Sequence, residues 1–152
     1  MSRLIKATPL AAILLFAALV PRSALAAPIF TTQTPFSYTD TSSCGFPLQV
    51  QGSSSNTLFF NGNGTVTYSF HGGGTVSANG TTFRFVFDGH NTYLTTGQSY
   101  TTGLQEQVTV PGAGLVIVDV GTLHFDANGN LVFAPGQHDF SVSAYAALCP
   151  YF

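Results

Sequence analysis

Two carboxylates, Glu106 and Asp119, are the residues whose types and spacing come closest to a catalytic pair. The segments on either side of Pro111 to Gly114 alternate apolar and polar residues, which predicts a hairpin that turns there. The cross-strand pairs that this hairpin predicts are Val110 with Leu115, Val108 with Ile117, and Glu106 with Asp119. Directly opposed side chains have Cβ atoms roughly 5 Å apart, which is also about the carboxylate spacing of retaining glycosidases.

Two opposed carboxylates on one face of a sheet have a cost. Like charges so placed destabilise the sheet unless one of them is protonated. Two structural alternatives compete with a functional pair of Glu106 and Asp119: a β-bulge that shifts the register by one residue, or a solvent-exposed face at that end of the hairpin. The pair is therefore the catalytic candidate of this chain, and the two structural alternatives stay open at this point.

The other polar motifs predict neither a metal site nor a cofactor. The four histidines are scattered, without the His-x-His or His-x-x-x-His spacing of a metal site; they are His71, His90, His124 and His138. Of these, His124 and His138 lie beside predicted turns, where we expect surface positions. The Asp126 to Asn130 segment superficially resembles a calcium loop, but Gln137 stands where the loop needs a glutamate.

The aromatic residues suggest a ligand more readily than the polar ones do. The chain contains 14 Phe and 6 Tyr but no Trp. We expect most of them in the core, yet a small antiparallel barrel can leave one cavity, and a cavity lined by Phe and Tyr suits an apolar ligand. The lack of Trp makes a carbohydrate-binding surface less attractive.

The elements that position these residues are predicted to be strands. Period-two alternation is frequent between residues 27 and 140, and Asn-Gly pairs such as Asn79-Gly80 punctuate it. This pattern predicts an all-β fold of about eight short antiparallel strands, in a single barrel or a sandwich. A barrel is favoured because Leu115 to Val118 is apolar on both faces. The alanines between Ser143 and Leu148 predict a short C-terminal helix or turn.

The first residues predict export. Arg3 and Lys6 precede a short apolar run, which ends in the small-residue triplet Ala24-Leu25-Ala26. We therefore expect a signal peptide at 1–26, a single β domain at 27–152, and a secreted, extracellular protein. Once the signal is removed, Arg84 is the one Lys or Arg left against six Asp and Glu residues. Such a surface argues against binding to nucleic acid or to anionic membranes.

Two cysteines, Cys44 and Cys149, lie near the two ends of the predicted domain. Exported proteins meet an oxidising environment, so we expect a disulfide between them. The loop that it closes is on the order of 100 residues, for which chain entropy predicts about 4.7 kcal/mol of stabilisation. Two free buried thiols are the alternative.

Several short motifs together resemble a family of uncharacterised secreted bacterial β-rich proteins. They are Cys44-Gly45-Phe46-Pro47, Val110-Pro111-Gly112-Ala113-Gly114, Phe125-Asp126-Ala127-Asn128-Gly129-Asn130, Gly136-Gln137-His138 and the late Cys149. The resemblance covers most of the chain after the predicted signal. It implies a single exported β domain with paired end cysteines, and it implies no activity, ligand or catalytic residue.

Two functional hypotheses follow from the sequence. The first is a secreted, non-catalytic β domain that binds a small apolar ligand or an extracellular protein partner. The second is a small secreted hydrolase or isomerase that uses Glu106 and Asp119. The relative position of these two carboxylates discriminates between the hypotheses, and the sequence leaves the oligomeric state open.

Overall fold

The structure is a computed structural model that describes residues 28–138 and 145–152. The predicted signal peptide lies outside the described residues, as do the first residues of the predicted C-terminal helix. Within the described part of the chain, no helix is long and apolar enough to span a membrane.

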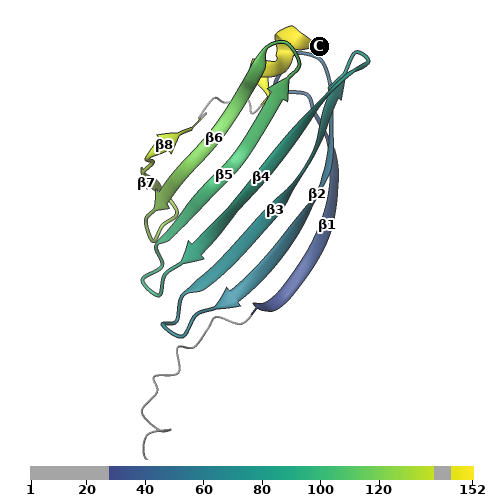
Figure 1. Cartoon of the computed structure of the whole chain (residues 1–152). Helices are drawn as coiled ribbons and strands as arrows, with labels where there is room; N and C mark the ends of the chain where they lie inside the picture. The colour runs from purple at the N-terminus through teal and green to yellow at the C-terminus, as the bar shows by residue number, and fades with distance from the viewer. Residues whose placement is uncertain (1–27, 139–144) are drawn as a thin grey trace, which may run out of the picture.

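One antiparallel sheet of eight strands makes up the fold (Figure 1). Its strands are β1 (Pro28–Asp40), β2 (Leu48–Phe60), β3 (Val66–Ala78), β4 (Thr81–Tyr93), β5 (Ser99–Val110), β6 (Gly114–Phe125), β7 (Leu131–Phe133) and β8 (Gly136–Gln137), and the chain ends in the 3-10 helix η1 (Ala146–Tyr151). The predicted all-β class and the short C-terminal helix are confirmed. The main strands are longer than expected, because β1 to β4 contain 13 residues each.

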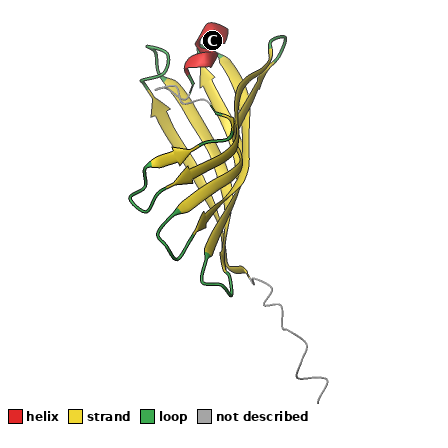
Figure 2. Cartoon of the chain, turned by 90° about the vertical axis from the view of Figure 1, so that its left-hand side faces the viewer, coloured by secondary structure: helices red, strands yellow, loops and turns green. Residues whose placement is uncertain are grey.

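The strands follow one another across the sheet in chain order, from β1 to β7, and β8 pairs with β6. The sheet curves strongly, so that it forms a half-closed shell with η1 at one end (Figure 2). The prediction left a barrel and a sandwich open, and the observed form is a single layer. Among the described strands, none pairs with the outer edge of β1, so the sheet does not close into the favoured barrel.

Glycines opposite phenylalanines allow this curvature. A Cβ added to Gly52, Gly72 or Gly89 would lie 2.7 Å from a Phe ring carbon, because a ring already occupies that space. The direct cross-strand pairs are Phe36 with Gly52, Gly72 with Phe87, and Phe70 with Gly89. Glycine relaxes the backbone where a sheet bends, and a neighbouring ring covers the exposed backbone.

The hydrophobic core lies inside the curve at the end of the sheet that carries η1, which we call the capped end. Its buried residues are Leu48, Val50, Val76, Phe83, Phe85, Val108, Val110, Ile117, Tyr145 and Leu148. The predicted disulfide joins Cys44 to Cys149, with their Cα atoms 5.3 Å apart, and attaches η1 to this end. Leu148 of η1 is 0% exposed, so the short helix completes the core that the strands leave open.

The outer face of the sheet is largely exposed. The expectation that both faces of residues 115–118 are covered is wrong, because Leu115 is 51% exposed whereas Ile117 is 3% exposed. An extra residue in β6, Val116, accounts for the difference: Leu115 pairs with Thr109 and Ile117 pairs with Val108. Thr109 and Val108 are neighbours on β5 and point to opposite faces, so Leu115 lies on the outer face and Ile117 on the inner face, which meets the core.

Candidate functional site

Glu106 and Asp119 face each other across β5 and β6, as predicted. The expected alternative, a β-bulge, is also present, but it lies beyond the pair: Leu104 pairs with Val120, so Gln105 is the extra residue of β5. Because the bulge comes after Glu106 when counted from the turn, it leaves the carboxylate pair in register. The same bulge places Gln105 and Glu106 opposite Phe87 of β4, whose neighbours Val86 and Asp88 pair with Gln107 and Leu104.

The predicted pair of Val110 with Leu115 is wrong, since Val110 faces Gly114. The turn is one residue shorter than expected, and an extra residue in β6, Val116, restores the register before Val108 meets Ile117. The two deviations cancel, which is why the position of the carboxylate pair was predictable although the turn was not.

Asp119 has donors on two sides. The Nδ1 atom of His138 lies 2.7 Å from Asp119 Oδ1 and donates to it. The side-chain amide of Gln105, oriented so that its nitrogen donates, lies 3.3 Å from the same oxygen. The His138 side chain is 2% exposed and that of Asp119 is 23% exposed. Asp119 is thus held by hydrogen-bonding partners on β5 and on the segment after β8.

Glu106 lies in a different environment, although it is directly opposite. Its Oε1 atom is buried and has no hydrogen-bond partner. Burial raises the pKa of Glu106 to about 7; a hydrogen-bonding interaction with Tyr145 opposes this rise, and the charge of Asp119 adds to it. Burial, together with the nearby Glu106 charge and the Tyr38 hydroxyl, raises the pKa of Tyr145 above its ordinary value. Near neutral pH, Glu106 is therefore a mixture of neutral acid and carboxylate.

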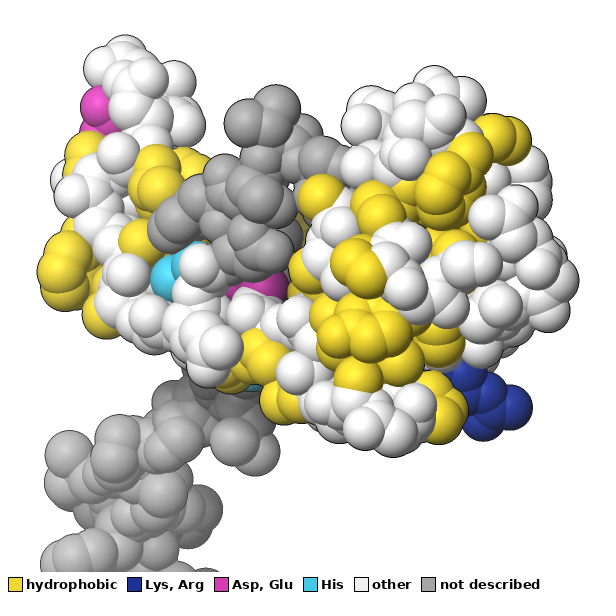
Figure 3. Space-filling view, turned by 90° about the horizontal axis from the view of Figure 1, so that it is seen from above, with side chains coloured by type: hydrophobic (Ala, Val, Ile, Leu, Met, Phe, Trp, Pro, Cys, Tyr) yellow, Lys and Arg dark blue, Asp and Glu magenta, His cyan; other side chains and the backbone are white. Residues whose placement is uncertain are grey.

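We call these five residues, Glu106, Asp119, His138, Tyr145 and Tyr38, the Glu106 site. The two opposed carboxylates have unequal numbers of hydrogen-bonding partners, and burial raises the pKa of Glu106, so Glu106 is the member that takes up a proton near neutral pH. Chemically, such a site can donate a hydrogen bond from neutral Glu106 to a carbonyl or ether oxygen, or act as a proton donor near neutral pH. Figure 3 shows carboxylate and histidine side chains next to each other inside the curve of the sheet.

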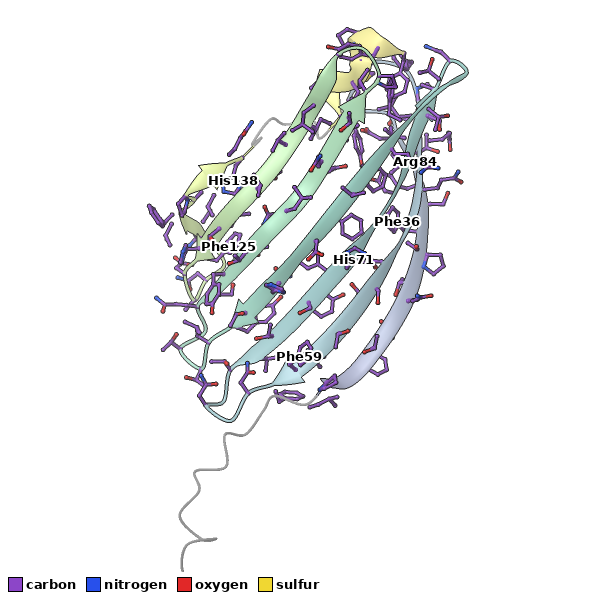
Figure 4. All side chains as sticks on the ribbon, viewed as in Figure 1. Phe36, Phe59, His71, Arg84, Phe125 and His138 are labelled. Atoms are coloured by element: carbon purple, nitrogen blue, oxygen red, sulfur yellow. A yellow bond between two sulfur atoms is a disulfide. The ribbon has the colours of Figure 1, made fainter. Side chains whose placement is uncertain are left out.

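Sequence reasoning missed the role of His138, for which a surface position beside a turn was predicted. The residue lies just after β8, which pairs with β6 through Val120 with Gln137 and Gly121 with Gly136 (Figure 4). The imidazole lies over these two glycines, since Cβ atoms added at Gly121 and Gly136 would be 2.9 and 3.1 Å from His138 Nε2. The signal in the sequence was this pair of glycines, which make room for a ring.

Tyr145 and Tyr38 were missed as well. Tyr145 precedes η1, and its backbone lies beside Cys149, whose Sγ is 3.8 Å from the Tyr145 carbonyl oxygen. The Cys44–Cys149 bond therefore holds the tyrosine against β5. Tyr38 comes from β1 at the opposite side of the sheet, so the curvature of the sheet brings the two together.

Half-buried phenylalanines continue the inner face away from the capped end. The rings of Phe36, Phe85 and Phe87 lie within 6.1 to 6.4 Å of one another, and Phe70 lies 6.3 Å from Phe87. Phe85 is buried, whereas Phe36, Phe70 and Phe87 are partly accessible. A partly accessible aromatic surface thus adjoins the strand segment that carries Glu106.

The other polar groups singled out in the sequence do not join the Glu106 site. His71 lies 3.1 Å from Asp88 on the outer face, where both side chains are more than half exposed. Asp126 accepts hydrogen bonds from the backbone of Asn128 and Asn130 within its own turn. Within residues 28–138 and 145–152, no group of three or more His, Cys, Asp or Glu side chains could hold a metal ion.

Comparison with known proteins gives no match: no protein-family profile fits the chain, and no curated protein or solved structure is similar to it. The resemblance to secreted bacterial β-rich proteins therefore stays a prediction. The class that the structure defines is a single-sheet, antiparallel β domain with one disulfide.

Proposed function

We propose that this chain is a secreted binding domain whose inner face takes a small, mostly apolar ligand with one hydrogen-bonding group directed at Glu106. The observation that carries the proposal is the buried Glu106 Oε1, which has no partner, on the same face as the partly accessible phenylalanines. Leaving a buried polar atom unsatisfied costs about 1 to 3 kcal/mol, and a ligand that supplies the missing hydrogen bond recovers this energy.

The aromatic surface supports the apolar part of the ligand. Phe36, Phe70 and Phe87 keep part of their rings accessible on the concave side of a single-layer sheet, where burial of apolar area is favourable by about 25 cal/mol per Å². The disulfide and the signal-like first residues support export. An extracellular protein partner is the alternative occupant, and a flat macromolecular surface fits a concave face less well than a small molecule does.

The proposal is tested with two ligands of similar size, acetophenone and ethylbenzene, of which only the first has a carbonyl oxygen. Their binding is followed by NMR shifts of Phe36, Phe70, Phe87 and Glu106. Acetophenone should bind more tightly than ethylbenzene at pH 6, and this preference should shrink at pH 8 as Glu106 loses its proton. Glu106→Ala should abolish the preference, whereas Thr39→Ala, on the exposed side of β1, should retain it.

Absence of saturable shifts at the inner-face phenylalanines for either compound would contradict the binding proposal. Native mass spectrometry of the protein as isolated adds an independent check, because a retained small molecule should be displaced by acetophenone. A protein partner would instead appear as a complex of much larger mass.

A second candidate function, acid catalysis by a small hydrolase, rests on one specific observation. A carboxyl with a pKa of about 7 lies opposite a carboxylate that a histidine orients at 2.7 Å, and enzymes tune acids toward the working pH in this way. Hydrolysis of nitrophenyl glycosides should then fall about 100-fold or more in both Glu106→Gln and Asp119→Asn. Equal rates in the variants and the parent would exclude this candidate.

A further inference from the structure

The outer face of the sheet carries two adjoining hollows that meet at Arg84. The first has a volume of about 470 Å³ and is lined by Thr82, Arg84, Gln107, Thr109 and Pro111 among others. The second, of about 370 Å³, lies over Gly73, Gly74 and Thr75 and also includes Arg84. We call the two together the Arg84 hollow. Figure 4 labels Arg84 on β4, far across the sheet from His138.

Strand register explains the composition of the hollow. Arg84 pairs directly with Thr75 on β3 and with Thr109 on β5, so a hydroxyl flanks the arginine on each side. Gly73, which pairs with Val86, has no side chain to fill the next position. A row of short side chains beside a long one leaves a depression on an otherwise flat sheet face.

The charge of the hollow is unusual for this protein. Arg84 is the one Lys or Arg in the described part of the chain, and none of the residues that line either hollow is Asp or Glu. In the described residues, Arg84 makes no ion pair within 4.0 Å. The next carboxylate on the same face of β4, Asp88, is four residues away, about 13 Å along the strand, and lies against His71.

We propose that the Arg84 hollow binds a small molecule that carries a carboxylate or sulfate group. A guanidinium presents a planar fork of donors that matches two oxygens of such a group. The hydroxyls of Thr75 and Thr109 and the amide of Gln107 add donors around the same anion. This site is on the opposite face from the Glu106 site and does not depend on the function proposed there.

The test uses glucuronate and its neutral counterpart glucose, with the full chain in its oxidised form. Binding is measured by NMR shifts of the Arg84 Nε–H and of the Thr75 and Thr109 amides. Glucuronate should give saturable shifts at these positions, weakened by added NaCl, while glucose should bind about tenfold more weakly or worse. Inorganic sulfate should displace glucuronate, since both place an oxyanion on the guanidinium.

Three variants separate the contributions. Arg84→Gln should weaken glucuronate binding about tenfold or more, and Arg84→Lys should weaken it less, because the charge remains and the fork is lost. Thr39→Ala, a threonine change on the exposed face of β1, should bind like the parent protein. Both positions, Arg84 and Thr39, are exposed, and unchanged thermal unfolding confirms that the variants fold.

Equal shifts with glucose and glucuronate would overturn the proposal. So would glucuronate binding that survives Arg84→Gln, or that sulfate fails to displace. Shifts that rise linearly with concentration and do not saturate would identify a nonspecific charge effect and overturn it as well.

Discussion

The capped end and the Glu106 site occupy the same strands and the same inner face, yet they bury different kinds of group. The capped end buries apolar side chains, whereas the Glu106 site buries a polar atom. At the capped end Val108 is 0% exposed and packs among apolar side chains under η1. Two residues earlier on β5, Glu106 points to the same side and buries an oxygen without a partner. The fold is thus held together at one end, and tolerates an unfavourable polar group beside it. Sites retained for binding or catalysis are where such groups concentrate.

The largest effect should come from opening the capped end. Cys149→Ser removes the bond to Cys44 that closes a long loop, and it should reduce the free energy of unfolding by about 2 to 5 kcal/mol in a urea titration. The double variant Cys44→Ser with Cys149→Ser should lose no more than the single one. A further large loss in the double variant would show that Cys44 contributes by packing rather than through the bond.

Removing the apolar contact of η1 should have a comparable or slightly smaller effect. Leu148→Ala deletes a side chain that is 0% exposed in the core, and such changes cost about 2 to 5 kcal/mol. Leu131→Ala is the matched control, because Leu131 is 44% exposed on β7, and it should change stability by less than about 1 kcal/mol. Similar losses in both variants would contradict the role assigned to η1.

A substitution in the Glu106 site should raise the stability of the fold, whereas the changes at the capped end lower it. Because the pKa of Glu106 is raised in the fold to about 7 from an ordinary value of 4.5, the folded state binds more protons than the unfolded state between these values. Its contribution to stability is therefore complete below about pH 4.5 and is lost as the pH rises through 7. Glu106→Gln removes this loss, so the variant should gain on the order of 2 kcal/mol over the parent at pH 8 relative to pH 4.

Asp88→Asn is the control for that measurement, since Asp88 is an exposed carboxylate on the outer face. Its stability relative to the parent should change little between pH 4 and pH 8. If Glu106→Gln and Asp88→Asn follow the same pH profile, Glu106 is not the group that costs stability.

The sequence predicted the fold class, the disulfide and the opposed carboxylates because all three depend on local patterns or on chemistry. The alternation on both sides of Pro111 indicated the hairpin, and the shorter turn and the extra residue Val116 cancelled, so Glu106 still faces Asp119. The open sheet was not predictable, because closure depends on the accumulated curvature of six long strands. Cross-strand glycine pairs such as Gly121 with Gly136 set that curvature locally, and they appear only once the register is known.

The residues that surround Glu106 could not be predicted from the sequence, for the same reason. His138, Tyr145 and Tyr38 come from three separate parts of the chain, and they meet only through the pairing of β8 with β6, the Cys149 bond and the curl of the sheet toward β1. No spacing rule links them. The sequence alone does not distinguish a buried histidine from a surface histidine beside a turn.

The central claim is that Glu106, with its buried Oε1 atom, is the proton-accepting member of an unequal carboxylate pair. An NMR titration of its side-chain carboxyl carbon tests this most directly, in the parent protein and in Asp119→Asn and Tyr145→Phe. The account predicts a midpoint of about 7 in the parent, a lower midpoint in Asp119→Asn because a neighbouring charge is removed, and a higher one in Tyr145→Phe because a stabilising hydroxyl is lost. A midpoint near the ordinary value of a glutamate, unmoved by either change, would contradict it.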